Sequence, residues 1–238
     1  MSKNCIQLFG EQNLNELIEA FNMALIKNEN IIPLIELPVA NGEKRFFKSV
    51  NSYLHNDKGN IIGKLIDINE EETEKKKLII KSETDGLTGI YNAITTRNLI
   101  TERIMSVDSK VRDALIIIDC DKFKDINDTY GHLQGDKILV NISKSLTETF
   151  RKSDIIGRIG GDEFCVYMKD ISSPDFLISK CQQLKALIGE LNKEFNCTVS
   201  IGISLLADEK SYDELFQKAD KALYEAKRKG RDQVQFFM

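Results

Sequence analysis

The fold of this chain is decided at Ile155-Ile156-Gly157-Arg158-Ile159-Gly160-Gly161-Asp162-Glu163-Phe164-Cys165-Val166-Tyr167-Met168. Its apolar parts, 155–159 and 164–168, predict two β-strands. The paired glycines between them predict a tight hairpin tip, because glycine adopts positive φ at little cost. Two adjacent carboxylates, Asp162 and Glu163, lie at that tip. They form either a solvated acidic turn or a site for a hard divalent cation on a rigid hairpin.

A second acidic cluster favours the cation site. It follows the apolar, β-branched run 114–118, which is typical of a buried central strand. That run ends in Asp119-Cys120-Asp121-Lys122-Phe123-Lys124. A carboxylate at the end of a buried strand emerges at the edge of the sheet, where active sites form. The two strands therefore bring acidic groups to one edge, a pattern that suits Mg²⁺ held by carboxylates and nucleotide phosphates.

Four motifs in order carry a family resemblance over the last two thirds of the chain. Residues 160–164 spell GGDEF. The segments 85–92, 119–136 and 219–231 match the patterns D-x-L-T-G-L-x-N, D-x-D-x-F-K-x-x-N-D-x-x-G-H-x-x-G-D and A-D-x-A-L-Y-x-A-K-x-x-G-R, with Ile90 in place of the second Leu of the first. The chain resembles the GGDEF family of diguanylate cyclases.

The predicted fold class is α+β, with a GGDEF domain over residues 85–238. Its strands and helices follow the order β-α-β-β-α-β, which is the ferredoxin-like arrangement shared by nucleotide cyclases and polymerase palms. Beside the hairpin, strands are predicted at 114–120, 197–205 and 233–237, and helices at 95–106, 122–130, 135–150, 173–195 and 211–229.

The part before the GGDEF domain is predicted as two pieces. Residues 1–69 are predicted to form a helix over 13–28 followed by three antiparallel strands. This segment resembles the C-terminal half of a PAS sensor domain. A half domain predicts no bound cofactor there, and the alternative is a structural cap or a dimerisation element. Residues 70–84 predict a connector helix, supported by Glu and Lys four residues apart. That helix is either a solvated spacer or a signalling helix that pairs with its twin.

The resemblance assigns the metal and catalytic residues. It implies that Asp119 and Asp162 bind two Mg²⁺ ions per active site, with Mn²⁺ as the alternative, helped by the backbone carbonyl of Cys120 rather than by its thiol. It also implies that Asp162 helps to deprotonate an attacking 3′-hydroxyl. Glu163 supports the metals or shares the base role, and Lys124 meets phosphate oxygens.

Substrate residues follow from the same resemblance. The triphosphate is expected to be held by backbone amides near Phe123 and by the side chains of Lys124, Lys227 and Arg231. Without the resemblance, the segment 227–231 would be interpreted as the solvated basic end of a helix. The predicted base readers are Asn127 and Asp136. A carboxylate accepts hydrogen bonds from the ring N–H and amino group of guanine, which adenine does not offer together, so Asp136 favours GTP. His132 either packs in its turn or contacts substrate, and the resemblance favours contact.

An R-x-x-D motif, Arg151 to Asp154, lies five residues before Gly160. It is either an ordinary surface pair or the family's inhibitory site, and the spacing favours the second. There, Arg151 and Asp154 would hold c-di-GMP, assisted by Arg158, and the enzyme would be inhibited by its product.

Composition limits the alternatives. The chain has 238 residues and a net charge of −4, which argues against a general nucleic-acid binder. Its five scattered cysteines read as reduced thiols. No signal peptide or long apolar run is present, so a cytoplasmic protein without a membrane segment in this chain is expected.

The predicted function is a diguanylate cyclase that condenses two GTP into c-di-GMP and two pyrophosphates. Because each domain binds one GTP, a homodimer is required. The rivals are an inactive GGDEF domain that acts as a nucleotide receptor and a cyclase that also uses ATP.

Overall fold

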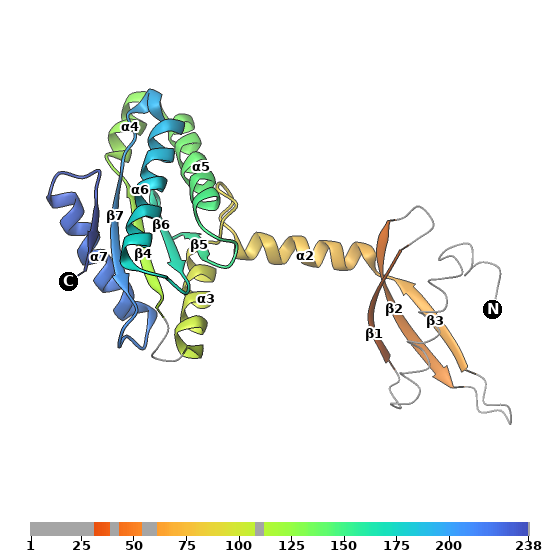
Figure 1. Cartoon of the computed structure of the whole chain (residues 1–238). Coiled ribbons are helices and arrows are strands. Elements are labelled where there is room, and N and C mark those ends of the chain that lie inside the picture. Colours follow the sequence, from red (N-terminus) through yellow and green to blue (C-terminus); the bar gives the residue numbers. More distant parts are fainter. Residues whose placement is uncertain (1–30, 39–42, 54–60, 108–111, 238) are drawn as a thin grey trace. The chain divides into compact units, whose positions relative to one another are not determined.

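The computed structural model describes residues 31–38, 43–53, 61–107 and 112–237 (Figure 1). The chain divides into two compact units, one up to Ile79 and one from Ile80.

The first unit contains the predicted three-stranded antiparallel sheet. The strands are β1 (Ile31–Pro38), β2 (Lys44–Tyr53) and β3 (Ile61–Asp67), in that spatial order. Pro33 lies on the edge strand, where the register with β2 shifts between Ile32 and Ile35. A proline has no N–H for the ladder, so this irregular edge position accommodates it. The helix predicted over 13–28 lies outside the described residues, and the PAS resemblance stays a prediction.

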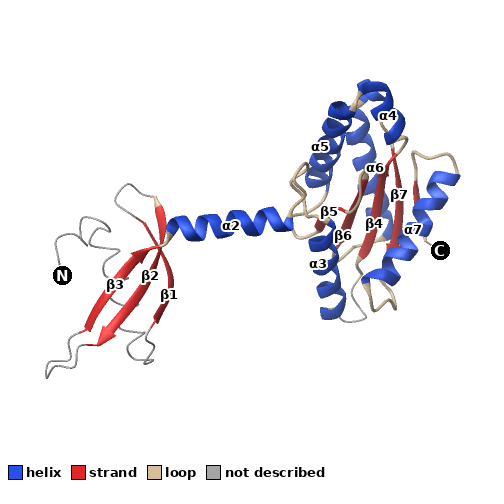
Figure 2. Cartoon of the chain, turned by 180° about the vertical axis from the view of Figure 1, so that it is seen from behind, coloured by secondary structure: helices blue, strands red, loops and turns tan. Residues whose placement is uncertain are grey.

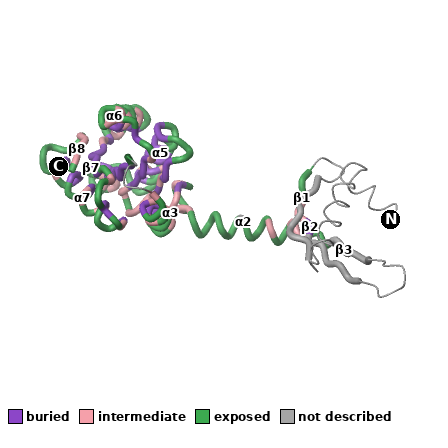
Figure 3. The backbone as a smooth tube through the Cα atoms, turned by 60° about the horizontal axis from the view of Figure 1, so that its bottom comes forward, coloured by how far each residue is buried: buried purple, intermediate pink, exposed green. Residues whose placement is uncertain are grey.

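Helix α2 (Asn69–Glu83) forms at the predicted connector and crosses the division between the units. Its first turn is acidic and Lys81 lies in its last turn, which complements the helix dipole. The one ion pair among its described side chains joins Lys75 to Glu72 at 3.8 Å, three residues apart rather than the predicted four. Most of its described residues are exposed (Figure 3).

The second unit is built on one five-stranded sheet with the order β5-β6-β4-β7-β8. The strands are β4 (Ala114–Cys120), β5 (Ile155–Arg158), β6 (Glu163–Met168), β7 (Val199–Leu205) and β8 (Val234–Phe236). All neighbours are antiparallel except β7 and β8. The first four strands in sequence give the predicted ferredoxin-like order, so the α+β prediction is confirmed.

Helices cover both faces of this sheet (Figure 2). The helices are α3 (Ala93–Ser106), α4 (Phe123–Tyr130), α5 (His132–Thr149), α6 (Pro174–Leu191) and α7 (Tyr212–Arg228). Buried residues of α5 and α6 form one core with the sheet, and buried residues of α3 and α7 form the other. Ser173 and Ser211 cap α6 and α7 with their hydroxyls, at the predicted helix starts.

Two helix boundaries differ from the prediction by three residues or more. Helix α5 begins at His132 rather than 135, because Gly131 adopts a φ of 84° and turns the chain directly from α4 into α5. Helix α6 ends at Leu191, where buried Asn192 donates its side-chain N–H to Ile188 O at 2.9 Å. A 3₁₀ turn, Lys193–Phe195, follows in place of the last predicted helical turn.

The alternation of side chains along β4 positions the site. All seven residues of β4 are buried. Ile116, Ile118 and Cys120 belong to the core beneath α5 and α6. Leu115 and Ile117 belong to the core beneath α3 and α7. Since the side-chain period of a strand is two residues, the carboxylates at 119 and 121 continue the α3–α7 face.

Candidate active site at the hairpin edge of the sheet

The pairing of β4 with β6 brings the acidic residues together. Asp119 is the Cα partner of Glu163, and the N–H of Cys120 donates to Asp162 O at 3.2 Å. The end of the central strand and the base of the hairpin therefore present three carboxylates at one edge of the sheet.

The hairpin tip does not use its glycines as predicted. Neither Gly160 nor Gly161 has positive φ, so the prediction of a left-handed tip is wrong. The loop closes instead because the N–H groups of Ile159 and Gly160 both donate to Glu163 O, at 2.9 and 3.3 Å. A Cβ at Gly160 would lie 2.7 Å from Glu163 Oε2, so a larger residue there would displace the Glu163 carboxylate. The Arg158 guanidinium donates to Gly161 O at 2.6 Å and holds the tip.

Asp119 lies at the electrostatic centre of the site. Burial raises its pKa to about 6; the ion pair with Lys227 opposes this shift, and the charges of Asp162 and Glu163 add to it. Lys227 Nζ lies 2.7 Å from Asp119 Oδ2. A partly buried group of negative charges, only partly neutralised by one lysine, favours the binding of a cation.

The donors at this edge fit a hard metal ion. Within the described ranges, no group of three or more His, Cys, Asp and Glu side chains is arranged to hold a metal. The predicted set has two carboxylates, Asp119 and Asp162, and the Cys120 carbonyl, and such a set suits Mg²⁺, which keeps waters and takes phosphate oxygens as further ligands. The Cys120 thiol lies in the α5–α6 core, 3.4 Å from Cys197 Sγ. Its position there agrees with an oxygen-only site.

Residues predicted to contact the nucleotide follow β4. Phe123 begins α4 directly after Lys122, whose φ is 55°, and Lys124 is exposed on the first turn. The Oδ1 atom of Asn127 is buried and has no hydrogen-bond partner within the part of the chain that is described. His132 and Asp136 are exposed on the first turns of α5.

The other predicted phosphate ligands lie at the end of α7. Lys227 is in its last turn, and Arg231 follows in a loop with a φ of 67°. Arg231 helps to line a hollow of about 480 Å³, between that loop and the start of α4. The structure thus brings Lys227 to the carboxylates and places Arg231 beside the segment that follows β4.

Comparison with known proteins identifies the domain. The family described as "Diguanylate cyclase, GGDEF domain" matches residues 82–233. The chain belongs to the GGDEF family.

Similar proteins agree with this assignment. The chain is 36% identical over 166 residues to "Probable diguanylate cyclase DgcC" of Escherichia coli K12, covering 68% of this chain and 45% of that protein. It therefore spans less than half of that relative. Among solved structures, the chain shares its fold with the coiled coil and GGDEF domain of DgcB from Caulobacter crescentus, solved in complex with c-di-GMP. The TM-score is 0.65 and the sequence identity is 21%. The match covers 71% of this chain and 93% of that one. A microbial GGDEF domain solved with bis-(3′,5′)-cyclic di-GMP gives a TM-score of 0.60 at 29% identity, covering 67% and 99%.

The R-x-x-D residues of the GGDEF domain line a separate hollow. Asp154 is buried, and its carboxylate accepts hydrogen bonds from the N–H groups of Arg151 (2.9 Å) and Lys169 (3.1 Å). The Arg151 guanidinium lies 5.8 Å from the centre of the Phe176 ring. Both motif residues line a hollow of about 340 Å³. The other residues that line it are Thr84, Gly89, Ile90, Tyr91, Thr147, Phe150, Lys152 and Ile156.

Arg158, the third residue predicted for that site, is engaged elsewhere. Its Nη1 donates to Asp85 Oδ1 at 3.0 Å, while Nε and Nη2 donate to Gly161 O. Burial would raise the pKa of Asp85, but hydrogen bonds from Thr88 and Arg158 outweigh it and lower the pKa below its usual value. Asp85 thus fixes the hairpin tip through Arg158, a role that the sequence reading did not assign.

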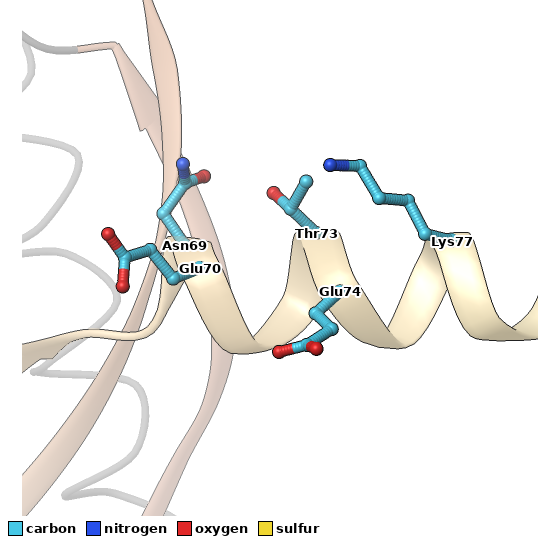
Figure 4. A pocket seen from close by; sticks show the side chains of 5 residues that line it. All are labelled: Asn69, Glu70, Thr73, Glu74 and Lys77. Atoms are coloured by element: carbon cyan, nitrogen blue, oxygen red, sulfur yellow. The ribbon is translucent and has the colours of Figure 1, made fainter.

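The N-terminal part of α2 carries a further hollow of about 350 Å³ (Figure 4). All five residues that line it come from α2: Asn69, Glu70, Thr73, Glu74 and Lys77. A surface formed by one helix alone cannot enclose a ligand, so this hollow is not a candidate site.

None of the helices in the described part of the chain has the length and apolar character that a membrane span requires.

Proposed function

We propose that this chain is a diguanylate cyclase, which condenses two GTP into c-di-GMP and releases two pyrophosphates. The observation that carries the proposal is the acidic edge itself: Asp119 opposite Glu163, with Asp162 beside them and Lys227 at 2.7 Å from Asp119. This site combines ligands for a hard cation with a cation for phosphate. A GTP-consuming enzyme of this kind works in the cytoplasm.

The carboxylates would hold metal and accept a proton. Asp119, Asp162 and the Cys120 carbonyl would hold two Mg²⁺ ions, with Mn²⁺ as the alternative. Bound metal neutralises the triphosphate and makes the α-phosphorus more electrophilic. Asp162 accepts the proton of the 3′-hydroxyl, and Glu163 stabilises the edge or shares that role. The 3′-oxygen forms a bond to the α-phosphorus of the other GTP, and the bond to the pyrophosphate oxygen breaks.

Cationic groups hold the leaving phosphates. Lys227 would exchange its contact with Asp119 for a phosphate oxygen when nucleotide binds, and Arg231 would bind the same chain of phosphates. Lys124 and the backbone amide of Phe123, at the start of α4, would complete this set. Because these groups lie at the N-terminus of a helix, the site favours the binding of negatively charged phosphate oxygens.

The base is recognised between α4 and α5. The buried Oδ1 of Asn127, which has no partner among the described residues, would accept a hydrogen bond from guanine. That bond would remove the cost of a buried acceptor without a partner. Asp136 would accept from the ring N–H and amino group, so the site prefers GTP to ATP. His132, exposed in the same turn, would contact the substrate.

Two chains are needed, since each GGDEF domain holds one GTP and each 3′-hydroxyl attacks the other nucleotide. Leu78 and Ile80 are 61% and 59% exposed on α2. Exposed apolar residues on a helix favour a signalling helix that pairs with its twin over a purely solvated spacer.

Product inhibition is the second part of the proposal. Arg151 and Asp154 line one hollow, and relatives of the family have been solved with c-di-GMP. We propose that c-di-GMP binds there through the Arg151 guanidinium and lowers turnover. Arg158 would join this site only by leaving Asp85 and Gly161.

The deciding experiment incubates the purified chain with GTP and Mg²⁺ and detects c-di-GMP by mass. Asp162→Ala should abolish the product while leaving c-di-GMP binding intact. Arg151→Ala is the matched control: it should keep turnover and raise it at high product concentration. Binding of c-di-GMP without turnover would favour the receptor alternative, and cyclic products containing adenosine from mixed GTP and ATP would favour the less selective cyclase.

A further inference from the structure

The loop after α7 has an unusual backbone. Gly230, Arg231 and Asp232 have φ values of 117°, 67° and 47°, so three consecutive residues lie in the left-handed region. Residues other than glycine adopt that region at an energetic cost. Such a backbone persists only where surrounding contacts fix it.

One of these contacts comes from Asp121, the residue directly after the central strand β4. The N–H of Asp232 donates to Asp121 Oδ2 at 3.1 Å. Asp121 is itself buried, with an exposed fraction of 6%. Its carboxylate also accepts hydrogen bonds from Thr198 Oγ1 (2.8 Å) and Ser200 Oγ (2.6 Å) on the β7 side. Asp121 therefore ties the loop to two neighbouring strands at once.

Asp121 has no role in the proposed chemistry. Its two oxygens already accept three hydrogen bonds, and a buried carboxylate repels phosphate. Its effect must pass through the loop that it holds. The residue in that loop with a free charge is Arg231, whose guanidinium has no partner among the residues described and which lines the hollow beside Asp121.

Asp119 in β4 and Asp121 directly after β4 act on the same end of α7. Asp119 contacts the side chain of Lys227 in the last turn of α7, and Asp121 contacts the backbone next to Arg231. We propose that Asp121 is a positioning residue, which fixes the loop over 230–232 so that Arg231 is held ready for the phosphates of the nucleotide. This inference rests on the proposed binding of GTP.

The test is a double-mutant cycle on the KM for GTP. Asp121→Asn keeps the size of the side chain but turns an N–H group toward at least one of its donors. It should raise the KM for GTP about tenfold, which corresponds to the loss of one strong contact with the nucleotide. It should change kcat by less than about twofold. In the Arg231→Ala background, Asp121→Asn should leave KM unchanged. An equal rise in KM in both backgrounds, or no rise in either, overturns the proposal.

A second variant guards against a failure to fold. Thr198→Val removes one hydrogen bond to the same oxygen, Asp121 Oδ2, and should raise KM by a smaller factor, again only when Arg231 is present. Lys185→Met is the comparison variant. It removes the ion pair with the Asp232 carboxylate (3.0 Å) and the hydrogen bond to the Asp232 carbonyl, but it leaves the hydrogen bond from the Asp232 N–H to Asp121. It should change KM less than Asp121→Asn does, and a larger effect would overturn the proposal.

A readout independent of activity separates this inference from the proposed function. The amide of Asp232 should exchange slowly with solvent in the wild type and at least about tenfold faster in Asp121→Asn. Wild-type protein that makes no c-di-GMP contradicts the cyclase proposal, and the cycle is then read on GTP affinity by calorimetry. No binding of GTP, or no change in amide exchange, overturns the positioning role.

Discussion

At the scale of single residues, Gly135 leaves room for Asn127, a residue of the proposed base site. A Cβ at this position would lie 1.9 Å from Asn127 Oδ1. That oxygen is the end of a side chain that can rotate, so Gly135→Ala should displace Asn127 without unfolding the protein. Alanine is a better helix former than glycine by about 1 kcal/mol, so stability should hold or rise.

The expected result is a rise of about tenfold in the KM for GTP with an unchanged unfolding midpoint. Steady-state kinetics and urea unfolding measure the two quantities. Asn127→Ala is the control: it should raise KM by a similar factor, and adding Gly135→Ala to it should change nothing further. Normal KM in Gly135→Ala would remove Asn127 from the base site.

Cys120 gives the second residue-scale prediction. The hydrogen bond with Cys197, and then burial, raise the pKa of the Cys120 thiol far above its usual value, so it stays protonated and is a poor metal ligand. Cys120→Val keeps the backbone carbonyl and an apolar side chain of similar size. Turnover at saturating Mg²⁺ and the Mg²⁺ concentration for half-maximal rate should change less than about twofold. A large increase in the required Mg²⁺ would assign the thiol to the metal site.

At the scale of elements, the two ends of β4 have different roles: one end carries a proposed catalytic carboxylate, and the segment before the other end carries a network that stabilises the fold. Asp119 lies near its active-site end. Before its other end, fully buried Asp113 accepts hydrogen bonds from Arg103 Nε (2.9 Å) and Tyr167 Oη (3.0 Å). Burial and the charge of Asp113 raise the pKa of Tyr167 well above its usual value, so the phenol stays a donor.

This network predicts variants that lose stability but keep activity. Tyr167→Phe should lower the free energy of unfolding by about 1 kcal/mol, and Asp113→Ala by about 3 kcal/mol because it leaves buried donors without an acceptor. The KM for GTP should stay the same in folded protein. Urea unfolding and kinetics below the transition test both statements; a changed KM with unchanged stability would contradict the separation.

At the scale of the whole molecule, sequence patterns predicted most of the second unit. The apolar run of β4, the hairpin and the capped helices α6 and α7 have strong local signals, and the structure has them at the expected places. Contacts between distant segments gave no such signal. Arg158 and Asp85 are 73 residues apart, and their ion pair decides that Arg158 holds the hairpin rather than the R-x-x-D hollow. The backbone at Gly160 and Gly161 is held by the Arg158 guanidinium, which donates to Gly161 O, and by the hydrogen bonds to Glu163 O, and local turn rules include neither contact.

The requirement for two chains gives the last prediction. If each c-di-GMP needs two intact GGDEF domains, an inactive chain that pairs with a wild-type chain forms an inactive dimer. The wild-type chain in that dimer makes no product. Mixing equal amounts of wild type and Asp162→Ala should lower c-di-GMP synthesis per wild-type chain to about half, and excess variant should nearly abolish it. The control is Asp162→Ala that also carries Leu78→Lys and Ile80→Lys. Leu78 and Ile80 lie on opposite faces of α2, so the two changes place a charge on whichever face pairs. If α2 pairs through either side chain, the added charge prevents pairing and wild-type activity returns. Synthesis that stays constant as Asp162→Ala is added, measured by mass under saturating GTP, would show that the active species is not a dimer of exchanging chains.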